Sequence, residues 1–140
     1  MSTPPNVDLL NQNFIKWTEQ ANLERIHVIV ATKQKEKIDD QSFYDAIFIA
    51  AKKRDNRCLD MIIKYSPLSV IELTLLIALA KPNNPTYIKV AQKICDLNKL
   101  CELDSEQQND IKSEAQANNL SKVAKIILNL RQSNQIKKCN

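Results

Sequence analysis

The sequence contains no glycine among its 140 residues. Glycine takes positive φ and lets a backbone approach a ligand closely, and both P-loops and dinucleotide-binding turns depend on those properties. Tight hairpins between β-strands usually need Asn-Gly or Asp-Gly. The abundant Leu, Ile, Ala, Lys, Gln and Asn instead recur with a period near 3.6 residues. The sequence therefore predicts an all-α fold.

The charge of the chain is weakly positive. The chain has 20 Lys and Arg and 16 Asp and Glu, which gives a formal net charge of +4 that is spread along the chain. A nucleic-acid-binding protein usually concentrates its positive charge on one face. We therefore expect nucleic acid to be the less favoured partner.

The cysteines do not form a metal-binding pattern. Cys58, Cys95, Cys101 and Cys139 are scattered, and His27 is the sole histidine. Zinc sites need ligands in short converging pairs, so we expect neither a metal nor another cofactor. Two cysteines fall on apolar helix faces, which is typical of reduced core thiols in a cytosol. The thiol expected to be most exposed is Cys139, to which we assign no function.

The apolar stretches do not predict a membrane protein. The first twenty residues lack a basic start followed by an apolar run, so we expect no secretory signal peptide. The stretch from Leu68 to Ala80 is too short to span a bilayer, and it contains Glu72. We expect a soluble, cytoplasmic protein, or one in a host cytoplasm if it is a secreted effector.

The apolar spacing and the break signals predict seven to nine helices. A polar start with Pro4 and Pro5 precedes the first helix, the link 33–41 is charged, and Pro82 to Pro85 forms a loop before a helix that begins at Pro85. The segment 97–104 is a link that carries the apolar residues Leu100, Cys101 and Leu103 among polar ones. The predicted helices cover approximately 7–21, 23–30, 42–54, 56–65, 69–80, 85–96, 105–117 and 120–132.

Three helix starts resemble capping boxes. Ser42 has Asp45 three residues later, Ser69 has Glu72 and Ser105 has Gln108. At Asn118-Asn119, we expect the first Asn to end a helix in the left-handed conformation and the second to cap the final helix. That final helix is predicted to use Leu120, Val123, Ile126, Ile127 and Leu130 as its apolar stripe.

The helices repeat in pairs. The residue that stands three positions before the apolar pair of each second helix is Ile26, Leu59, Ala91 and Val123, with spacings of 33, 32 and 32 residues. Phe14, Ile47 and Ile111 each lie twelve residues before their reference residue. Four helix-turn-helix units at nearly constant spacing indicate a genuine repeat.

The unit resembles an ankyrin repeat. Ala50-Ala51 late in a first helix, Asp55 to Ile63 in a second helix, and the similar stretches 21–29 and 117–128 carry the resemblance, which covers roughly residues 10–130. The family's Thr-Pro-Leu-His opening, its glycines and its β-hairpin finger have no counterpart. The resemblance therefore implies a degenerate ankyrin-like stack or another α-solenoid. In either form, each hairpin covers the open face of its neighbour.

We predict one helical-repeat domain over residues 1–140. The ordered part is a short right-handed stack of about four antiparallel hairpins over approximately residues 7–132, followed by a polar tail at 133–140. The sequence leaves open whether the first helix pair is a repeat or a cap, and it predicts no oligomeric state.

Candidate binding residues lie on first helices and at one turn. Trp17 and Tyr44 are predicted on the first-helix face that lines the concave side of ankyrin-like stacks, where an aromatic residue is either core or a binding anchor. Phe48 is predicted to pack inside. The densest basic run supplies Lys52, Lys53, Arg54 and Arg57, which either contact phosphates or simply close a helix C-terminus, where cations are favoured.

No catalytic residue is predicted. His27 has no clustered partner, and catalysis requires converging groups, so a structural or surface role is favoured. Asp39 and Asp40 lie in a charged link and are expected to be solvated rather than paired for catalysis.

The predicted function is that of a non-catalytic protein-protein interaction module, not an enzyme. It would act as an inhibitor, adaptor or effector by masking or bridging another protein, whose identity the sequence does not give. The alternative is a nucleic-acid-binding α-solenoid that uses the basic turn and the lysines of the 33–37 link, with steeply salt-dependent binding.

Overall fold

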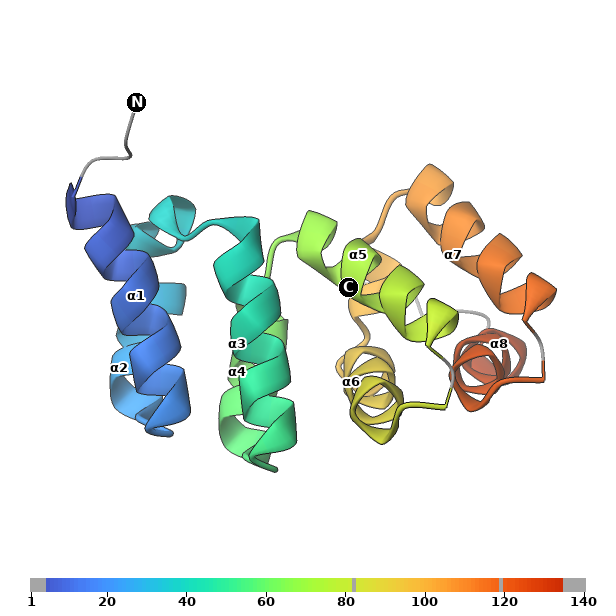
Figure 1. The fold of residues 1–140 in the computed structure, drawn as a ribbon. Helices are drawn as coiled ribbons and strands as arrows, with labels where there is room; N and C mark the ends of the chain where they lie inside the picture. The colour runs from blue at the N-terminus through green and yellow to red at the C-terminus, as the bar shows by residue number, and fades with distance from the viewer. Residues whose placement is uncertain (1–4, 82, 119, 135–140) are drawn as a thin grey trace. The chain divides into compact units, whose positions relative to one another are not determined.

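A computed structural model describes residues 5–81, 83–118 and 120–134, and over these residues the chain is helical without any strand. The all-α prediction is therefore confirmed (Figure 1). The α-helices are α1 (Pro5–Glu19), α2 (Leu23–Val30), α3 (Asp40–Lys52), α4 (Asn56–Tyr65), α5 (Leu68–Ala80), α6 (Pro85–Asp96), α7 (Ser105–Ala117) and α8 (Lys122–Asn134). Two 3-10 helices, η1 (Lys33–Lys37) and η2 (Lys99–Glu102), lie in links between them.

The chain divides into two compact units, Met1–Val70 and Ile71–Asn140, which we call the first unit and the second unit. The division falls within α5, three residues after that helix begins. None of the described helices is both long enough and apolar enough to cross a membrane.

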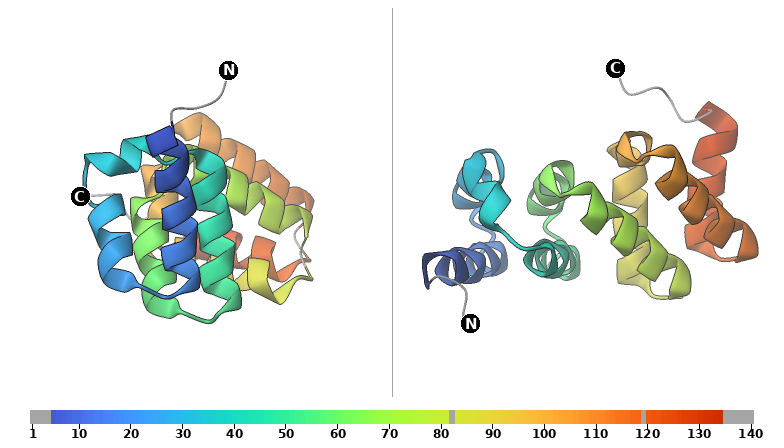
Figure 2. Two further views of the ribbon diagram at one scale, coloured as in Figure 1. Left: turned by 60° about the vertical axis from the view of Figure 1, so that its left-hand side comes forward. Right: turned by 90° about the horizontal axis from the view of Figure 1, so that it is seen from above.

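The first unit is built from two helical hairpins. α1 packs against α3 and α2 packs against α4, so α1 with α3 and α2 with α4 form two layers (Figures 1 and 2). The rings of Phe14 and Phe43 meet edge to face between the α1 and α3 helices, with centroids 5.2 Å apart, and both side chains are completely buried. The predicted second-helix stripes are also buried, with Ile26 in α2 and Leu59 in α4 fully enclosed.

Both hairpins of the first unit turn in the same way. At the end of α1, Ala21 has φ of 56°, its N–H donates to the Thr18 carbonyl, and the Asn22 N–H donates to the Trp17 carbonyl. Arg54 has φ of 59°, and the hydrogen bonds at the end of α3 follow the same pattern. This pair of bonds is the Schellman motif, which usually places glycine at the left-handed position.

The residue after each left-handed position caps the next helix. The Asn22 side chain accepts from the Arg25 N–H at 3.2 Å, and the Asp55 carboxylate accepts from the Cys58 N–H at 3.2 Å. The caps therefore lie 33 residues apart, as do the two left-handed residues. Because the turn is fixed by hydrogen bonds of the backbone and the cap, the absence of glycine has not prevented it.

The predicted capping box at Ser42 is wrong. α3 begins at Asp40, its cap is Asp39, whose carboxylate accepts from the Ser42 N–H at 2.7 Å, and Ser42 itself is buried. The Asp39 N–H in turn donates to the Asn11 side chain at 2.9 Å, so α1 helps to position the start of α3. The charged link 33–41 contains η1, which is capped by Thr32.

The second unit has less regular connections. α6 packs against α8, α7 packs against α8, η2 packs against α6, and α5 runs alongside α7 (Figures 1 and 2). Pro85 is the first residue of α6 as predicted, and Asn84 caps the helix by accepting from the Thr86 N–H at 2.9 Å. The buried core includes Ala91, Ile94, Ile111, Ala115 and Val123.

Two further cap predictions require correction. α5 begins at Leu68, so Ser69 is not its cap. α7 does have a capping box, but Asp104 and Gln107 form it, one residue before the predicted pair Ser105 and Gln108. A Ser and an Asp at adjacent positions can both cap, and the Asp carboxylate makes the stronger, charge-assisted bond.

The start of the last helix also differs from the prediction. α8 begins at Lys122, the Ala124 N–H donates to the Ser121 hydroxyl, and Leu120 lies outside the helix with 87% of its surface exposed. Asn118 ends α7 with φ of −120°, so it is not left-handed, while Asn119 lies outside the described residues. The apolar stripe that was predicted for α8 therefore begins at Val123.

Candidate interaction surfaces

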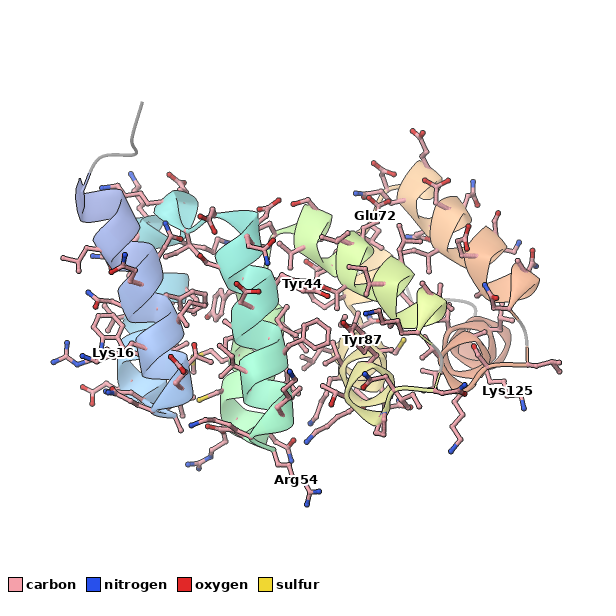
Figure 3. The ribbon with its side chains drawn as sticks, in the orientation of Figure 1. Lys16, Tyr44, Arg54, Glu72, Tyr87 and Lys125 are labelled. Atoms are coloured by element: carbon pink, nitrogen blue, oxygen red, sulfur yellow. The ribbon has the colours of Figure 1, made fainter. Side chains whose placement is uncertain are left out.

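The two predicted aromatic anchors occupy different places in the first unit. Trp17 on α1 is half-buried, and the Arg25 guanidinium of α2 lies 5.2 Å from its ring centroid. Tyr44 on α3 packs on Phe48 with ring centroids 4.8 Å apart, and it extends from the side of α3 opposite α1 (Figure 3). Phe48 is buried, as predicted. Each aromatic ring therefore has its own local partner.

The predicted basic residues gather around the turn between α3 and α4. Lys52, Lys53 and Arg54 are exposed in succession, and Arg57 is exposed in the first turn of α4. Arg54 projects from this end of the hairpin (Figure 3). The Lys53 ammonium donates to the carbonyl of Glu19, the last residue of α1. This contact gives Lys53 a structural role, since a cation is favoured at a helix C-terminus.

The remaining titratable candidates also have structural roles. The exposed His27 ring of α2 meets Tyr65 of α4 edge to face, with centroids 6.3 Å apart. Asp39 caps α3, and the Asp40 carboxylate accepts from the Ser69 hydroxyl at 2.8 Å. The two carboxylates are thus engaged in separate contacts. Within the described residues, no three His, Cys, Asp or Glu side chains are arranged to hold a metal ion.

Two cysteines are buried free thiols, as their positions on apolar helix faces predicted. Burial raises the pKa of the Cys95 thiol from 9.0 to about 12, and the Asp96 carboxylate contributes to the increase. Burial likewise raises the pKa of Cys58 to about 12, with a hydrogen bond to Asp55 and the charge of that carboxylate adding to it. Thiolates are the reactive form, so these thiols are inert at neutral pH. Cys101 in η2 is disulfide-bonded, and Cys139 lies outside the described residues.

A groove lies between α6 and α8 in the second unit, and it was not predicted from the sequence. It has a volume of about 760 Å³. Its apolar lining comes from Pro85 and Ile88 of α6, Ile126 of α8, and Leu120 just before α8. Both isoleucines are only half-buried. We call this feature the α6–α8 groove.

Positive charge surrounds the apolar lining of the α6–α8 groove. Four lysines line it, Lys89 and Lys93 from α6 and Lys122 and Lys125 from α8, together with three uncharged polar residues. Among the lining residues that the structure describes, none is Asp or Glu. Lys125 lies on the α8 helix as Figure 3 shows. The groove therefore combines exposed apolar surface with positively charged side chains.

The sequence explains why these side chains share one groove. Lys89 and Lys93 are four residues apart on α6, and Lys122 and Lys125 are three apart on α8, so each pair lies on one helical face. The caps at Asn84 and Ser121 set where the two helices begin. The spacing of the lysines was a usable signal, but only the packing of α6 against α8 turns two separate stripes into one surface.

Comparisons with protein-family models, with curated proteins and with solved structures find no match to this chain.

Proposed function

We propose that this chain is a non-catalytic protein-protein interaction module, and the α6–α8 groove is the observation that carries the proposal. Exposed apolar surface at a concave site has a cost in water that a bound protein segment removes. His27, Asp39 and Asp40, the residues weighed for catalysis, are engaged in ring, cap and hydroxyl contacts elsewhere in the chain. The chemistry of the site suits binding rather than catalysis.

We further propose that the module is a degenerate ankyrin-like repeat protein. Support comes from the first unit, where the left-handed residues Ala21 and Arg54 and the caps Asn22 and Asp55 recur at 33 residues. Layers of first and second helices in that unit fit the stacking of hairpins. Ankyrin-like proteins bind many kinds of protein partner, so the resemblance implies a binding role without specifying a partner.

Such a module acts by occupying a surface of its partner or by joining two partners. It would serve as an inhibitor, adaptor or effector in the cytoplasm, or in a host cytoplasm if it is secreted. In addition to the α6–α8 groove, two of the predicted surfaces remain candidate contacts. They are the aromatic residues Trp17 and Tyr44, and the basic turn with Lys52, Arg54 and Arg57.

The experiment is an affinity capture from lysate with the purified chain as bait, before and after nuclease treatment. Leu120→Glu tests the α6–α8 groove, Tyr44→Ala tests the first-helix face, and Arg54→Glu tests the basic turn. The captured protein is then purified and its binding to the chain measured directly. We expect a protein that survives nuclease and binds directly in the purified system. If all capture disappears with nuclease, the protein-binding proposal is wrong.

Nucleic acid binding is the second candidate, because Lys52, Arg54 and Arg57 are all exposed around one turn. It predicts binding that weakens steeply as salt increases, in proportion to the number of phosphates contacted. Titration of a labelled 20-nucleotide RNA and a 20-base-pair DNA at two salt concentrations measures this directly. Loss of that binding in Arg54→Glu would favour nucleic acid over protein.

A further inference from the structure

We propose that the α6–α8 groove binds an acidic amphipathic helix that belongs to another protein. This inference rests on the proposed interaction function and adds to it the site and the chemical class of the partner. Three properties of the groove lead to it: the helices that form its walls, the sign of its charges and the exposure of its apolar residues.

The walls of the groove favour a helical ligand over an extended one. An extended peptide binds most readily to the free edge of a sheet, where backbone N–H and C=O groups lack hydrogen-bond partners. α6 and α8 are helices whose interior backbone groups are already hydrogen-bonded, and they offer no such edge. Two helices packed side by side leave a groove into which the side chains of a third helix fit.

The charge of the groove selects an acidic ligand. Lys89 and Lys93 stand on one wall and Lys122 and Lys125 on the other, and the described lining residues include no Asp or Glu. A helix that lies between these walls places its flanks beside both lysine pairs, so Asp or Glu on both flanks of an apolar stripe would be complementary. Charges at the rim mainly set the rate of association and the choice of partner, whereas the apolar centre contributes most of the affinity.

The exposure of the groove favours a macromolecular ligand. Pockets for small molecules enclose most of the surface of their ligand. Leu120 stands at the edge of the α6–α8 groove and is 87% exposed, so one side of the groove is open to solvent. A partner helix would cover Leu120, Ile88 and Ile126, the exposed or half-buried apolar residues of the lining, together.

The test is a selection of helical peptides from a displayed library of random amphipathic 16-residue sequences, with the full chain as the target. Selected peptides are then synthesised with a fluorophore, and their affinities are measured by polarisation. Two groove variants are compared with the wild type: Leu120→Glu, and the double variant Lys122→Glu with Lys125→Glu. These side chains are exposed, so the variants should fold. The control is Lys33→Glu with Lys37→Glu, which changes the net charge equally in the first unit.

We expect the selected peptides to carry Asp or Glu on both sides of an apolar stripe. Their affinity should fall by about tenfold or more in each groove variant, because rim ion pairs become repulsions or the apolar contact is lost, and it should be little changed in the control. Raising the salt concentration should weaken the wild-type complex.

Several outcomes would overturn the inference. These are a selection that yields no binders, a preference for basic or uncharged sequences, or peptides that bind both groove variants as well as the wild type. If a captured partner protein binds directly but is unaffected by either groove variant, the proposed function stands and the groove proposal fails. If the groove variants instead abolish binding of a labelled 20-nucleotide RNA, the groove binds nucleic acid.

Discussion

The two units of this chain solve the same problem, joining short helices without glycine, in different ways. In the first unit, Ala21 and Arg54 both take the left-handed conformation and the next residue caps the following helix. In the second unit, α6 starts from an Asn-Pro cap, and α8 starts from Ser121. The first unit repeats one turn and has regular helix layers. The second unit uses different helix starts and has a groove between α6 and α8.

The contrast extends to how the second helices meet. Between α2 and α4, the His27 and Tyr65 rings are in contact and span the two helices. Between α6 and α8, Ile88 and Ile126 line a groove instead. Ile88 and Leu120 occupy the same position of the predicted repeat, three residues before Ala91 and Val123. An apolar residue at a repeated position can therefore belong to a groove rather than to the core.

The largest expected effect is on the core of the first unit. Phe43→Ala removes a fully buried ring that packs on Phe14, and we expect it to reduce the free energy of unfolding by about 3–5 kcal/mol. Chemical denaturation measures the loss, and hydrogen exchange locates it. Because Phe43 packs on Phe14 within the first unit, protection should fall mainly in residues 5–70.

The matched variant in the second unit is Ile94→Ala, which truncates a fully buried side chain of α6. We expect a loss of about 2–5 kcal/mol, with reduced protection mainly in α6 to α8. Equal loss of protection in both units for either variant would contradict the division of the chain into two compact units.

A smaller effect concerns the buried thiol of the second unit. The pKa of Cys95 is raised from 9.0 to about 12, so between these values the unfolded chain releases the proton while the folded chain keeps it. The unfolded state is then favoured, and stability falls as the pH rises above 9.0. At pH 10 the loss is about 1.4 kcal/mol for this thiol.

The variant Cys95→Val isolates this contribution, since it keeps a buried apolar side chain and removes the titrating group. Denaturation at several pH values between 7 and 10.5 should show a weaker decline in stability for Cys95→Val than for the wild type. Identical pH dependence in the two proteins would mean that the thiol is not protected by burial.

The smallest effect concerns the turns of the first unit. A non-glycine residue in the left-handed conformation carries a steric cost that glycine avoids, so Arg54→Gly should stabilise the protein by about 0.5–1 kcal/mol. Lys52→Gly removes the same charge two residues earlier, inside α3, and should destabilise by about 1 kcal/mol. Thermal unfolding of the wild type and of the two variants compares their stabilities. Destabilisation by Arg54→Gly would argue against the left-handed turn.

Much of the fold could be predicted from the sequence because apolar spacing and break signals together mark the helices, although α5 is apolar on nearly all sides and shows little helical period. The eight α-helices of the described residues lie within the predicted range of seven to nine, and Pro85 marked the start of α6 correctly. The caps of α3 and α7 were misassigned, because Asp39 and Asp104 cap these helices instead of Ser42 and Ser105, and α5 begins one residue before Ser69. Ser and Asp both fit the pattern of a capping residue, so the sequence alone does not show which of two nearby candidates caps the helix.

The α6–α8 groove could not be predicted in the same way. Leu120 was assigned to the buried stripe of the final helix because its spacing from Val123 fits a helical period. Its true position depends on where α8 starts and on the packing of α6 against α8, and both are tertiary properties. The basic turn, by contrast, was visible in the sequence because its four cations lie within six residues.

The most direct test of the central claim is chemical-shift mapping of the isotope-labelled chain with a purified partner or with a selected acidic peptide. We predict that the largest shifts fall in residues 85–93 and 120–126, which line the α6–α8 groove, while α1, Tyr44 and the turn at Arg54 change little. Shifts concentrated at Trp17, Tyr44 or residues 52–57, with the groove unaffected, would contradict the assignment of binding to the second unit.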